Sequence, residues 1–257
     1  MNLDTYTSEM AKSIWDKSFF MDKIPGTKCV IDFGCADGAM MRFLAPLFPD
    51  IMFVGYDIAT DLIERARHIT PYNHNNIYFT NHKDVIQFVK DKYKNDEICI
   101  NFSSVLHEVF SVTLGGREAI SDMIRELKPY YITIRDMYFS GQDRALPFYY
   151  ITEIVDELGI DKGFIEEFED YYGPLSSTKN LVHFLMKYQW RNNGWTEELD
   201  ENYFSWTIDQ FISLVKGYGR IFETHYMLPY YTEKWKTIGL QPMDICTHAQ
   251  FILRRWY

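Results

Sequence analysis

The chain has 257 residues, of which 47% are hydrophobic and 17% aromatic, so it can bury a core and is neither disordered nor collagen-like. No apolar run approaches the roughly 18 residues that a membrane span needs, and residues 1–12 are polar and mixed in charge. We therefore expect a soluble protein without a secretion signal. The 26 basic residues against 36 acidic ones give a net charge of −10, which disfavours nucleic acid as a partner.

The cysteines indicate a reducing compartment. They form no C-x-x-C pair, and three lie beside apolar runs, which favours reduced interior residues over a disulfide framework or a zinc site. We expect a cytoplasmic protein. We expect no metal site, because no two histidines stand one helical turn apart. The four cysteines are Cys29, Cys35, Cys99 and Cys246.

Short apolar segments alternate with helical patterns through the first half of the chain. Such alternation predicts a doubly wound α/β fold with a parallel sheet, whose ligand crevice lies at the carboxyl ends of the strands. Further along, a capped amphipathic helix and two strands are expected near the C-terminus. The expected strands cover residues 29–33, 51–56, 77–80, 98–102, 130–134, 220–227 and 248–254, and the expected helices cover 39–47, 60–69, 85–93, a segment from 105, and 207–215.

The ends of the first two strands carry a pattern that suits a nucleoside. Gly34 allows a tight turn close to a ligand, Gly38 lets the next helix start close beneath it, and Asp57 can accept both ribose hydroxyls. A dinucleotide is the first alternative. Asp32 and Asp37 would flank its pyrophosphate, however, whereas a sulfonium with an ammonium group gains from nearby carboxylates. The charges favour S-adenosylmethionine (SAM) over NAD.

The segments Val30-Ile-Asp-Phe-Gly-Cys-Ala-Asp-Gly38 and Val54-Gly-Tyr-Asp-Ile58 resemble motif I and the following acidic strand end of class I SAM-dependent methyltransferases. Ala36 replaces the middle glycine of the usual motif. The resemblance implies that the loop from Asp32 to Gly38 wraps the methionine moiety. It also implies that Asp57 holds the ribose, that Ile58 packs on the adenine, and that Asp84 reads the adenine amino group, with Asn81 and His82 equally placed for that task. The implied cofactor-binding residues are Asp32, Gly34, Cys35, Ala36, Gly38, Asp57, Ile58, Asp84 and Ser103.

The resemblance also implies a single domain over residues 1–257, built on a doubly wound, mainly parallel seven-stranded sheet with helices on both faces. Residues 138–206 fall where this family commonly inserts helices that cover the substrate. That segment is rich in Tyr, Phe and Trp, so we expect a helical lid in which Tyr149 and Tyr150 bind substrate. The alternative is that the aromatic side chains form only the core of the insertion.

The fourth strand leads into His107 and Glu108, where a methyl acceptor should approach. The signatures used to methylate base amines or cytosine carbon are absent. His107 is a candidate general base for a hydroxyl acceptor, with an internal bond to Glu108 as the structural alternative. Asp136, past the fifth strand, is a second catalytic candidate; its alternative is a partner for Arg135 or for a helix N-terminus.

The sequence therefore predicts a methyltransferase acting on a small molecule or peptide. Two alternatives stay open. An RNA or nucleotide methyltransferase would need a convergent basic patch, and a SAM-binding protein without turnover would consume no cofactor. Residues 151–170 hold eight acidic residues and one lysine, which indicates a solvated helix face or a dock for a cationic partner. The basic patch required by the RNA or nucleotide alternative would consist of Arg117, Arg125, Lys128, Arg254 and Arg255.

Overall fold

The computed structural model describes residues 13–82, 84–112, 114–192, 194–228, 231–232, 236 and 245–256. The polar segment at residues 1–12 lies outside these ranges. Among the helices that are described, none combines the length and the hydropathy that a membrane crossing requires.

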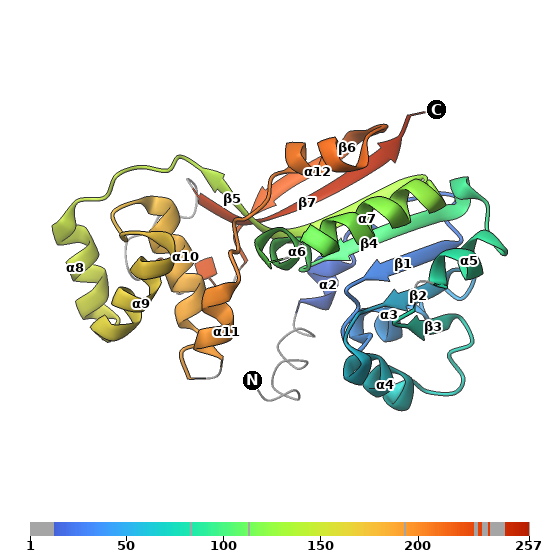
Figure 1. Cartoon of the computed structure of the whole chain (residues 1–257), viewed down its shortest axis with the longest axis horizontal. Helices are drawn as coiled ribbons and strands as arrows, with labels where there is room; N and C mark the ends of the chain where they lie inside the picture. Colours follow the sequence, from blue (N-terminus) through green and yellow to red (C-terminus); the bar gives the residue numbers. More distant parts are fainter. Residues whose placement is uncertain are drawn as a thin grey trace.

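A seven-stranded sheet forms the centre of the molecule, in the order β3-β2-β1-β4-β5-β7-β6 (Figure 1). β1 to β5 pair in parallel, while β7 runs antiparallel to both of its neighbours. The sheet is therefore mixed, and the expectation of a mainly parallel sheet applies only to β1 to β5. The strands are β1 (Cys29–Phe33), β2 (Met52–Tyr56), β3 (Ile77–Thr80), β4 (Ile98–Ser103), β5 (Tyr131–Gly141), β6 (Tyr218–Tyr226) and β7 (Ile245–Arg255).

Helices cover both faces of the sheet because successive residues of a buried strand point to opposite sides. Cys29 and Ile31 of β1 pack into one core with α5, α7 and α12, whereas Val30 packs into another with α3 and α4. The result is a three-layer α/β arrangement (Figure 1). These helices are α2 (Ile14–Lys17), α3 (Ala39–Leu44), α4 (Thr60–Ile69), α5 (Val85–Lys90), α6 (Leu106–Val112), α7 (Leu114–Leu127) and α12 (Ile208–Val215), with a short 3-10 helix, η1 (Asn95–Glu97).

Four further helices follow β5 and pack around a hydrophobic core of their own. They stand beside the end of the sheet, with α8 at the far end of the molecule (Figure 1). α10 is buried along most of its length, and Ser177 caps its N-terminus by accepting a hydrogen bond from the Asn180 N–H. This insertion consists of α8 (Phe148–Glu157), α9 (Lys162–Tyr172), α10 (Thr178–Tyr188) and α11 (Trp195–Asp200).

β5 and β7 extend past the rest of the sheet toward the insertion. The pairing of β5 with β4 ends at Arg135, whereas its pairing with β7 continues to Gly141 opposite Ile245, with an irregularity between Met137 and Ser140. The two strands thus form a ribbon that leads from the sheet to the four-helix insertion (Figure 1).

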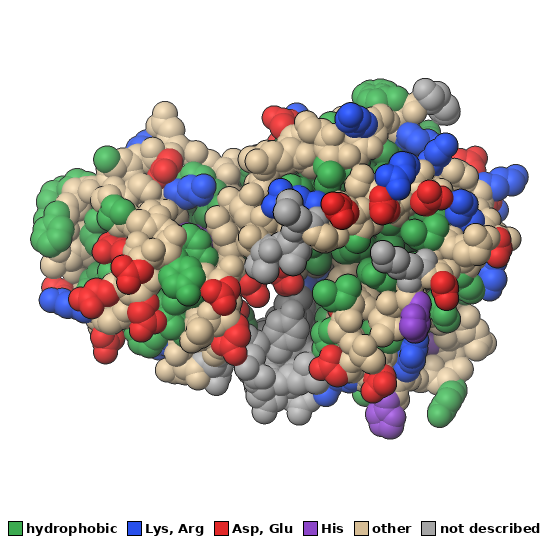
Figure 2. Space-filling model, in the orientation of Figure 1, with side chains coloured by type: hydrophobic (Ala, Val, Ile, Leu, Met, Phe, Trp, Pro, Cys, Tyr) green, Lys and Arg blue, Asp and Glu red, His purple; other side chains and the backbone are tan. Residues whose placement is uncertain are grey.

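The acidic run at residues 151–170 lies on α8 and α9, and acidic side chains gather on this part of the visible surface (Figure 2). Three of the carboxylates serve the insertion itself. Asp161 caps α9 by accepting a hydrogen bond from the Gly163 N–H. Glu167 accepts a hydrogen bond from the Trp195 indole, and Glu169 accepts one from the Leu175 N–H. Glu153, Asp156, Glu157, Glu166 and Asp170 are exposed, as a solvated helix face requires.

Candidate functional site

The loop between β1 and α3 takes three left-handed backbone conformations in five residues. Gly34 has φ of 77°, Ala36 of 48° and Gly38 of 78°. Glycine adopts this region freely, whereas an L-residue such as alanine costs about 1–2 kcal/mol there. Ala36 is held in place because its N–H donates a 2.9 Å hydrogen bond to Oδ2 of Asp57, a charge-assisted bond that offsets the backbone cost.

The two glycines of this loop are also required by packing. A Cβ on Gly34 would lie 2.6 Å from a methyl group of Val105, and one on Gly38 would overlap the Phe79 ring. Val105, just before α6, and Phe79 of β3 therefore lie so close to the loop that only glycine fits at positions 34 and 38. A larger residue at position 34 would first displace Val105 rather than fill open space.

Asp57 stands at the carboxyl end of β2 and organises two segments at once. Its Oδ2 accepts from Ala36 and its Oδ1 accepts from the Ala59 N–H at 2.9 Å, just before α4 begins. An ionised carboxylate has about four lone-pair positions, so two remain for ligand hydroxyls. Ile58, the next residue, is 82% exposed.

The short helix α2 brings a charged side chain over the ends of β1 and β4. Its Asp16 binds Arg135 at 2.6 Å and also accepts hydrogen bonds from the Tyr226 hydroxyl and the Gln250 amide. These bonds fix the position of the next residue, Lys17, which is buried. Burial, with the positive charge of Arg135, lowers the pKa of Lys17 to about 8.

A small cavity opens at this point, between α2, the loop and the end of β4. Its volume is about 40 Å³, room for a few water molecules, so a ligand of larger size would have to open the loop further. Ser103 contributes a buried Oγ that has no hydrogen-bond partner among the described residues. The lining comprises Ile14, Lys17, Asp32, Gly34, Cys35, Ala36, Asp37, Ala39, Met40 and Ser103.

Both signs of charge face this cavity. Asp32 is fully buried and accepts a 2.8 Å hydrogen bond from the Asn101 amide. Burial raises the pKa of Asp32 to about 6 despite that bond and the nearby Lys17 ammonium. An anionic group and a cationic group on a ligand would therefore each find an opposite charge here, and the orphaned Ser103 hydroxyl would gain a partner.

His107 and Asp136, which the sequence suggests separately, form a pair at the ends of β4 and β5. His107 Nδ1 lies 2.6 Å from Asp136 Oδ1. Asp136 also accepts from the N–H groups of Val105 and Leu106, at the start of α6. Burial on its own would raise the pKa of Asp136, but His107 and the N–H groups of Met137 and Leu106 hold it below its ordinary value. The interpretation of Asp136 as the partner of a helix N-terminus is consistent with this geometry.

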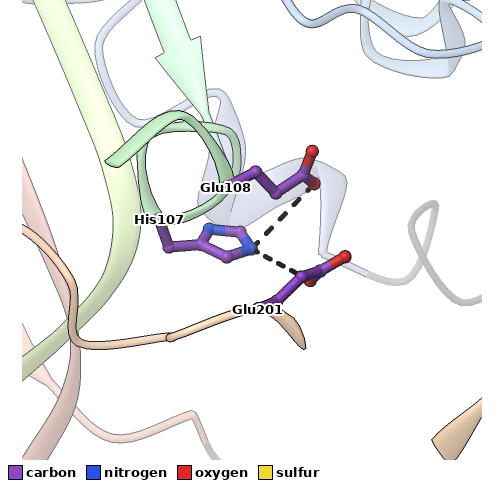
Figure 3. A group of neighbouring side chains, drawn as sticks. All are labelled: His107, Glu108 and Glu201. Atoms are coloured by element: carbon purple, nitrogen blue, oxygen red, sulfur yellow. Dashed lines mark ion pairs between the residues drawn. The ribbon is translucent and has the colours of Figure 1, made fainter. Parts of the chain in front are cut away.

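The other ring nitrogen of His107 faces two carboxylates (Figure 3). Nε2 lies 3.7 Å from Glu201 Oε2 and 4.0 Å from Glu108 Oε1. Burial alone would lower the pKa of His107, but Asp136, Glu201 and Glu108 raise it to about 10. Because carboxylates face both ring nitrogens, this geometry does not favour His107 as a general base.

The remaining expected residues are placed away from the cavity. Asp84 is exposed before α5, and the Asn81 amide donates to the Thr60 hydroxyl. Tyr149 and Tyr150 lie on α8, where Tyr149 is 68% exposed and Tyr150 packs against the core of the insertion. α8 is separated from the strand ends by α10 and α11 (Figure 1). The structure does not bring these residues together with His107.

Three residues near the cavity or His107 were not predicted from the sequence as site residues: Lys17, Glu108 and Glu201. Lys17 and Glu201 approach the strand ends from segments that only the fold brings near. Glu108 was visible as the neighbour of His107 but only as its bonding partner. A search of the sequence for acidic residues near His107 would have found Glu108; no local signal marks the other two.

The strand order with antiparallel β7, together with the cavity at the carboxyl ends of β1 and β4, defines the class I SAM-dependent methyltransferase fold. Solved structures with this fold match the chain over nearly its whole length. No protein-family model and no curated protein sequence matches it.

Three of these structures illustrate the likeness. A SAM-dependent methyltransferase from Anabaena variabilis is 14% identical, with a TM-score of 0.53 over 95% of this chain and 83% of that one. The plantazolicin methyltransferase BamL, solved with a triazolic desmethylPZN analog and SAH, is 13% identical, with a TM-score of 0.52 over 98% and 88%. The methyltransferase domain of bacterial CtHen1-CN is 11% identical, with a TM-score of 0.51 over 95% and 99%.

Proposed function

We propose that this protein binds SAM at the loop between β1 and α3 and transfers its methyl group to a small-molecule or peptide acceptor. The observation that carries the proposal is the cavity beside that loop. Lys17 and Asp32 offer one charge of each sign to the carboxylate and ammonium of the methionine moiety, and the Ser103 hydroxyl is buried there without a partner. The fold supports the same assignment, since structures with this fold carry SAH.

In this proposal, Asp57 accepts the ribose hydroxyls with the lone pairs that Ala36 and Ala59 leave unused. The loop residues Cys35, Ala36 and Gly38 surround the methionine moiety. Ile58 covers the adenine, which its exposure permits, and Asp84 reads the adenine amino group. The acceptor approaches from His107 and Asp136, at the ends of β4 and β5. In-line methyl transfer then depends mainly on positioning.

The insertion bears on the size of the acceptor. If Tyr149 and Tyr150 bind substrate, the acceptor has to extend from the strand ends to α8 (Figure 1), which favours an elongated molecule such as a peptide over a compact one. The larger aromatic residues of the insertion, including Trp195 and Phe184, are buried in its core. Most of the aromatic residues therefore stabilise the insertion itself.

No observation favours an RNA acceptor. Lys128 and Arg255 lie side by side, since the Arg255 guanidinium donates to the Lys128 carbonyl, and Arg254 pairs with Tyr131 at the beginning of β5. Parallel strands bind ligands at their carboxyl ends, so these basic residues stand at the opposite end of the sheet from the cavity. Arg125 is paired with Asp122.

Calorimetric titration with SAM and SAH tests the proposal. We expect saturable binding, and we expect Asp57→Ala to weaken it at least tenfold, because a hydrogen bond to a charged group contributes about 1.5–3 kcal/mol. Asp50→Ala, at an exposed position just before β2 and so at the opposite end of that strand from Asp57, is the matched control and should leave the affinity unchanged. Absence of binding by the folded protein would refute the proposal. SAM binding without methyl transfer to any acceptor of a broad panel would favour the alternative of a SAM-binding protein without turnover.

A further inference from the structure

We propose that His107, Glu108 and Glu201 bind a divalent transition-metal ion beside the cofactor cavity. The three side chains point toward one another (Figure 3), and their ligand atoms all lie within 4.8 Å of each other. His107 and Glu108 come from α6, and Glu201 comes from the end of the insertion. The expectation of no metal site considered only pairs of histidines and clusters near in sequence.

The orientation of His107 is the first argument. Its ring is 2% exposed, and Nδ1 is engaged by Asp136. This leaves Nε2 directed between the two glutamates, 3.7 Å from Glu201 Oε2 and 4.0 Å from Glu108 Oε1. Metal-binding histidines characteristically donate their second N–H to a carboxylate, which fixes the tautomer and the ring. Asp136 is placed to accept the Nδ1 proton here, and the ion would take the place of the proton on Nε2, which is released to solvent on binding.

The spacing is the second argument. Metal–nitrogen and metal–oxygen bonds of about 2.0–2.2 Å, at the tetrahedral angle, place two ligand atoms about 3.4 Å apart, so carboxylates now 3.7 and 4.0 Å from Nε2 need to move only slightly to share an ion with it. The glutamate side chains are 31% exposed for Glu201 and 46% for Glu108. They are therefore free to close on an ion while the buried ring stays fixed.

The backbone around the cluster is tied together. Ser111 donates to the His107 carbonyl at 2.6 Å and accepts from the Asn202 N–H at 2.8 Å. Ser205 donates to the same carbonyl at 2.8 Å, and the buried Lys187 ammonium donates to the carbonyl of Glu201. Glu201 is thus held opposite His107 by bonds that do not involve its carboxylate.

The donor set selects the kind of ion. One imidazole nitrogen with two carboxylates suits Mn²⁺, Fe²⁺, Co²⁺ or Zn²⁺, whereas Ca²⁺ and Mg²⁺ prefer oxygen ligands alone. Three protein ligands leave at least one coordination position open, as in catalytic rather than structural sites.

The location suggests a use for the open position. The start of α6 lies against the loop between β1 and α3, because Val105 is close to Gly34, so the ion would lie next to the cofactor. An acceptor with an oxygen donor, such as a hydroxyl or a carboxylate, would be held by the ion. This use depends on the proposed methyl transfer, whereas binding of the ion does not.

Titration of the metal-free full-length protein with Mn²⁺, followed by electron paramagnetic resonance, tests the site. We expect one Mn²⁺ per chain, displaced by equimolar Zn²⁺ but not by equimolar Ca²⁺. Glu201→Gln should lower the affinity at least 10- to 100-fold, because the loss of a group that merely orients a metal ligand already costs about that much. Glu166→Gln, at an exposed position of α9, is the matched control and should bind as the unmodified protein does.

His107→Gln and Glu108→Gln should show the same loss, with circular dichroism confirming the fold. Absence of Mn²⁺ uptake, equal displacement by Ca²⁺, or unchanged affinity in the folded Glu201→Gln variant would overturn the assignment. SAM titration of the metal-free protein separates the two proposals. Mn²⁺ binding without SAM binding would leave the metal site standing and refute the proposed function, and SAM binding without Mn²⁺ binding would do the reverse.

Discussion

Replacing Gly38 by alanine should destabilise the protein through two effects that the structure separates. Gly38 precedes α3 with φ of 78°, and an L-residue in this region costs about 1–2 kcal/mol. Its Cβ would also overlap the Phe79 ring, which is 4% exposed and cannot move freely. Overpacking of a core typically costs about 1–3 kcal/mol. We expect a total loss of about 2–5 kcal/mol in the free energy of unfolding.

Gly26→Ala isolates the first effect. Gly26 has φ of 83°, but nothing lies within 4 Å of the position that its Cβ would take, so the substitution should cost only the backbone contribution. Urea unfolding of both variants measures the difference. In a double-mutant cycle, Phe79→Leu should be less destabilising beside alanine at position 38 than beside glycine, because it removes the ring that the new methyl group meets. Equal losses in the Gly26 and Gly38 variants would refute the reasoning.

Two further outcomes are expected at the proposed site. SAM affinity should be greatest between about pH 6 and 8. Below this range Asp32, whose pKa is raised to about 6, gains a proton and no longer attracts the cationic ammonium group of SAM. Above this range Lys17, whose pKa is lowered to about 8, loses the positive charge that attracts the carboxylate of SAM. Calorimetry across pH measures this, Lys17→Met should remove the alkaline limb, and a flat profile would contradict the assignment. Tyr149→Ala should raise the Michaelis constant of an elongated acceptor while changing the SAM dissociation constant less than threefold, under about 1 kcal/mol. A weaker SAM affinity with an unchanged Michaelis constant for the acceptor would show that α8 does not contact substrate.

The sheet could be predicted because its strands are short, apolar and bounded by turn residues. β1, α4 and β3 begin and end where their patterns place them. β5 is the instructive exception, since it was expected to end at Ile134 but continues to Gly141. Arg135 and Asp136 read as the polar end of a strand. They are buried because Asp16 pairs with Arg135 and the start of α6 binds Asp136, and neither partner is near in sequence.

The same limit applies to the site. The loop from Gly34 to Gly38 and Asp57 have local signatures, because a tight turn and a strand-end acid each depend on a few consecutive residues. Lys17 and Glu201 have none. Lys17 reaches the cavity only because Asp16 is bound to β5 and β7. Glu201 reaches His107 only because Lys187 binds its carbonyl and Ser111 binds the N–H of the next residue, Asn202.

The separate core of the insertion has a consequence for how the molecule comes apart. His107 lies beside Leu106, in the core shared with the sheet, whereas Glu201 lies between Leu199 and Tyr203, in the core of the four helices. Segments with separate cores can open as separate cooperative units. Opening of the insertion alone would carry Glu201 away from His107 and leave the loop at Gly34 intact. Any ligand that bridges these two residues would couple the unfolding of both cores, and hydrogen exchange in α10 would slow when that ligand binds.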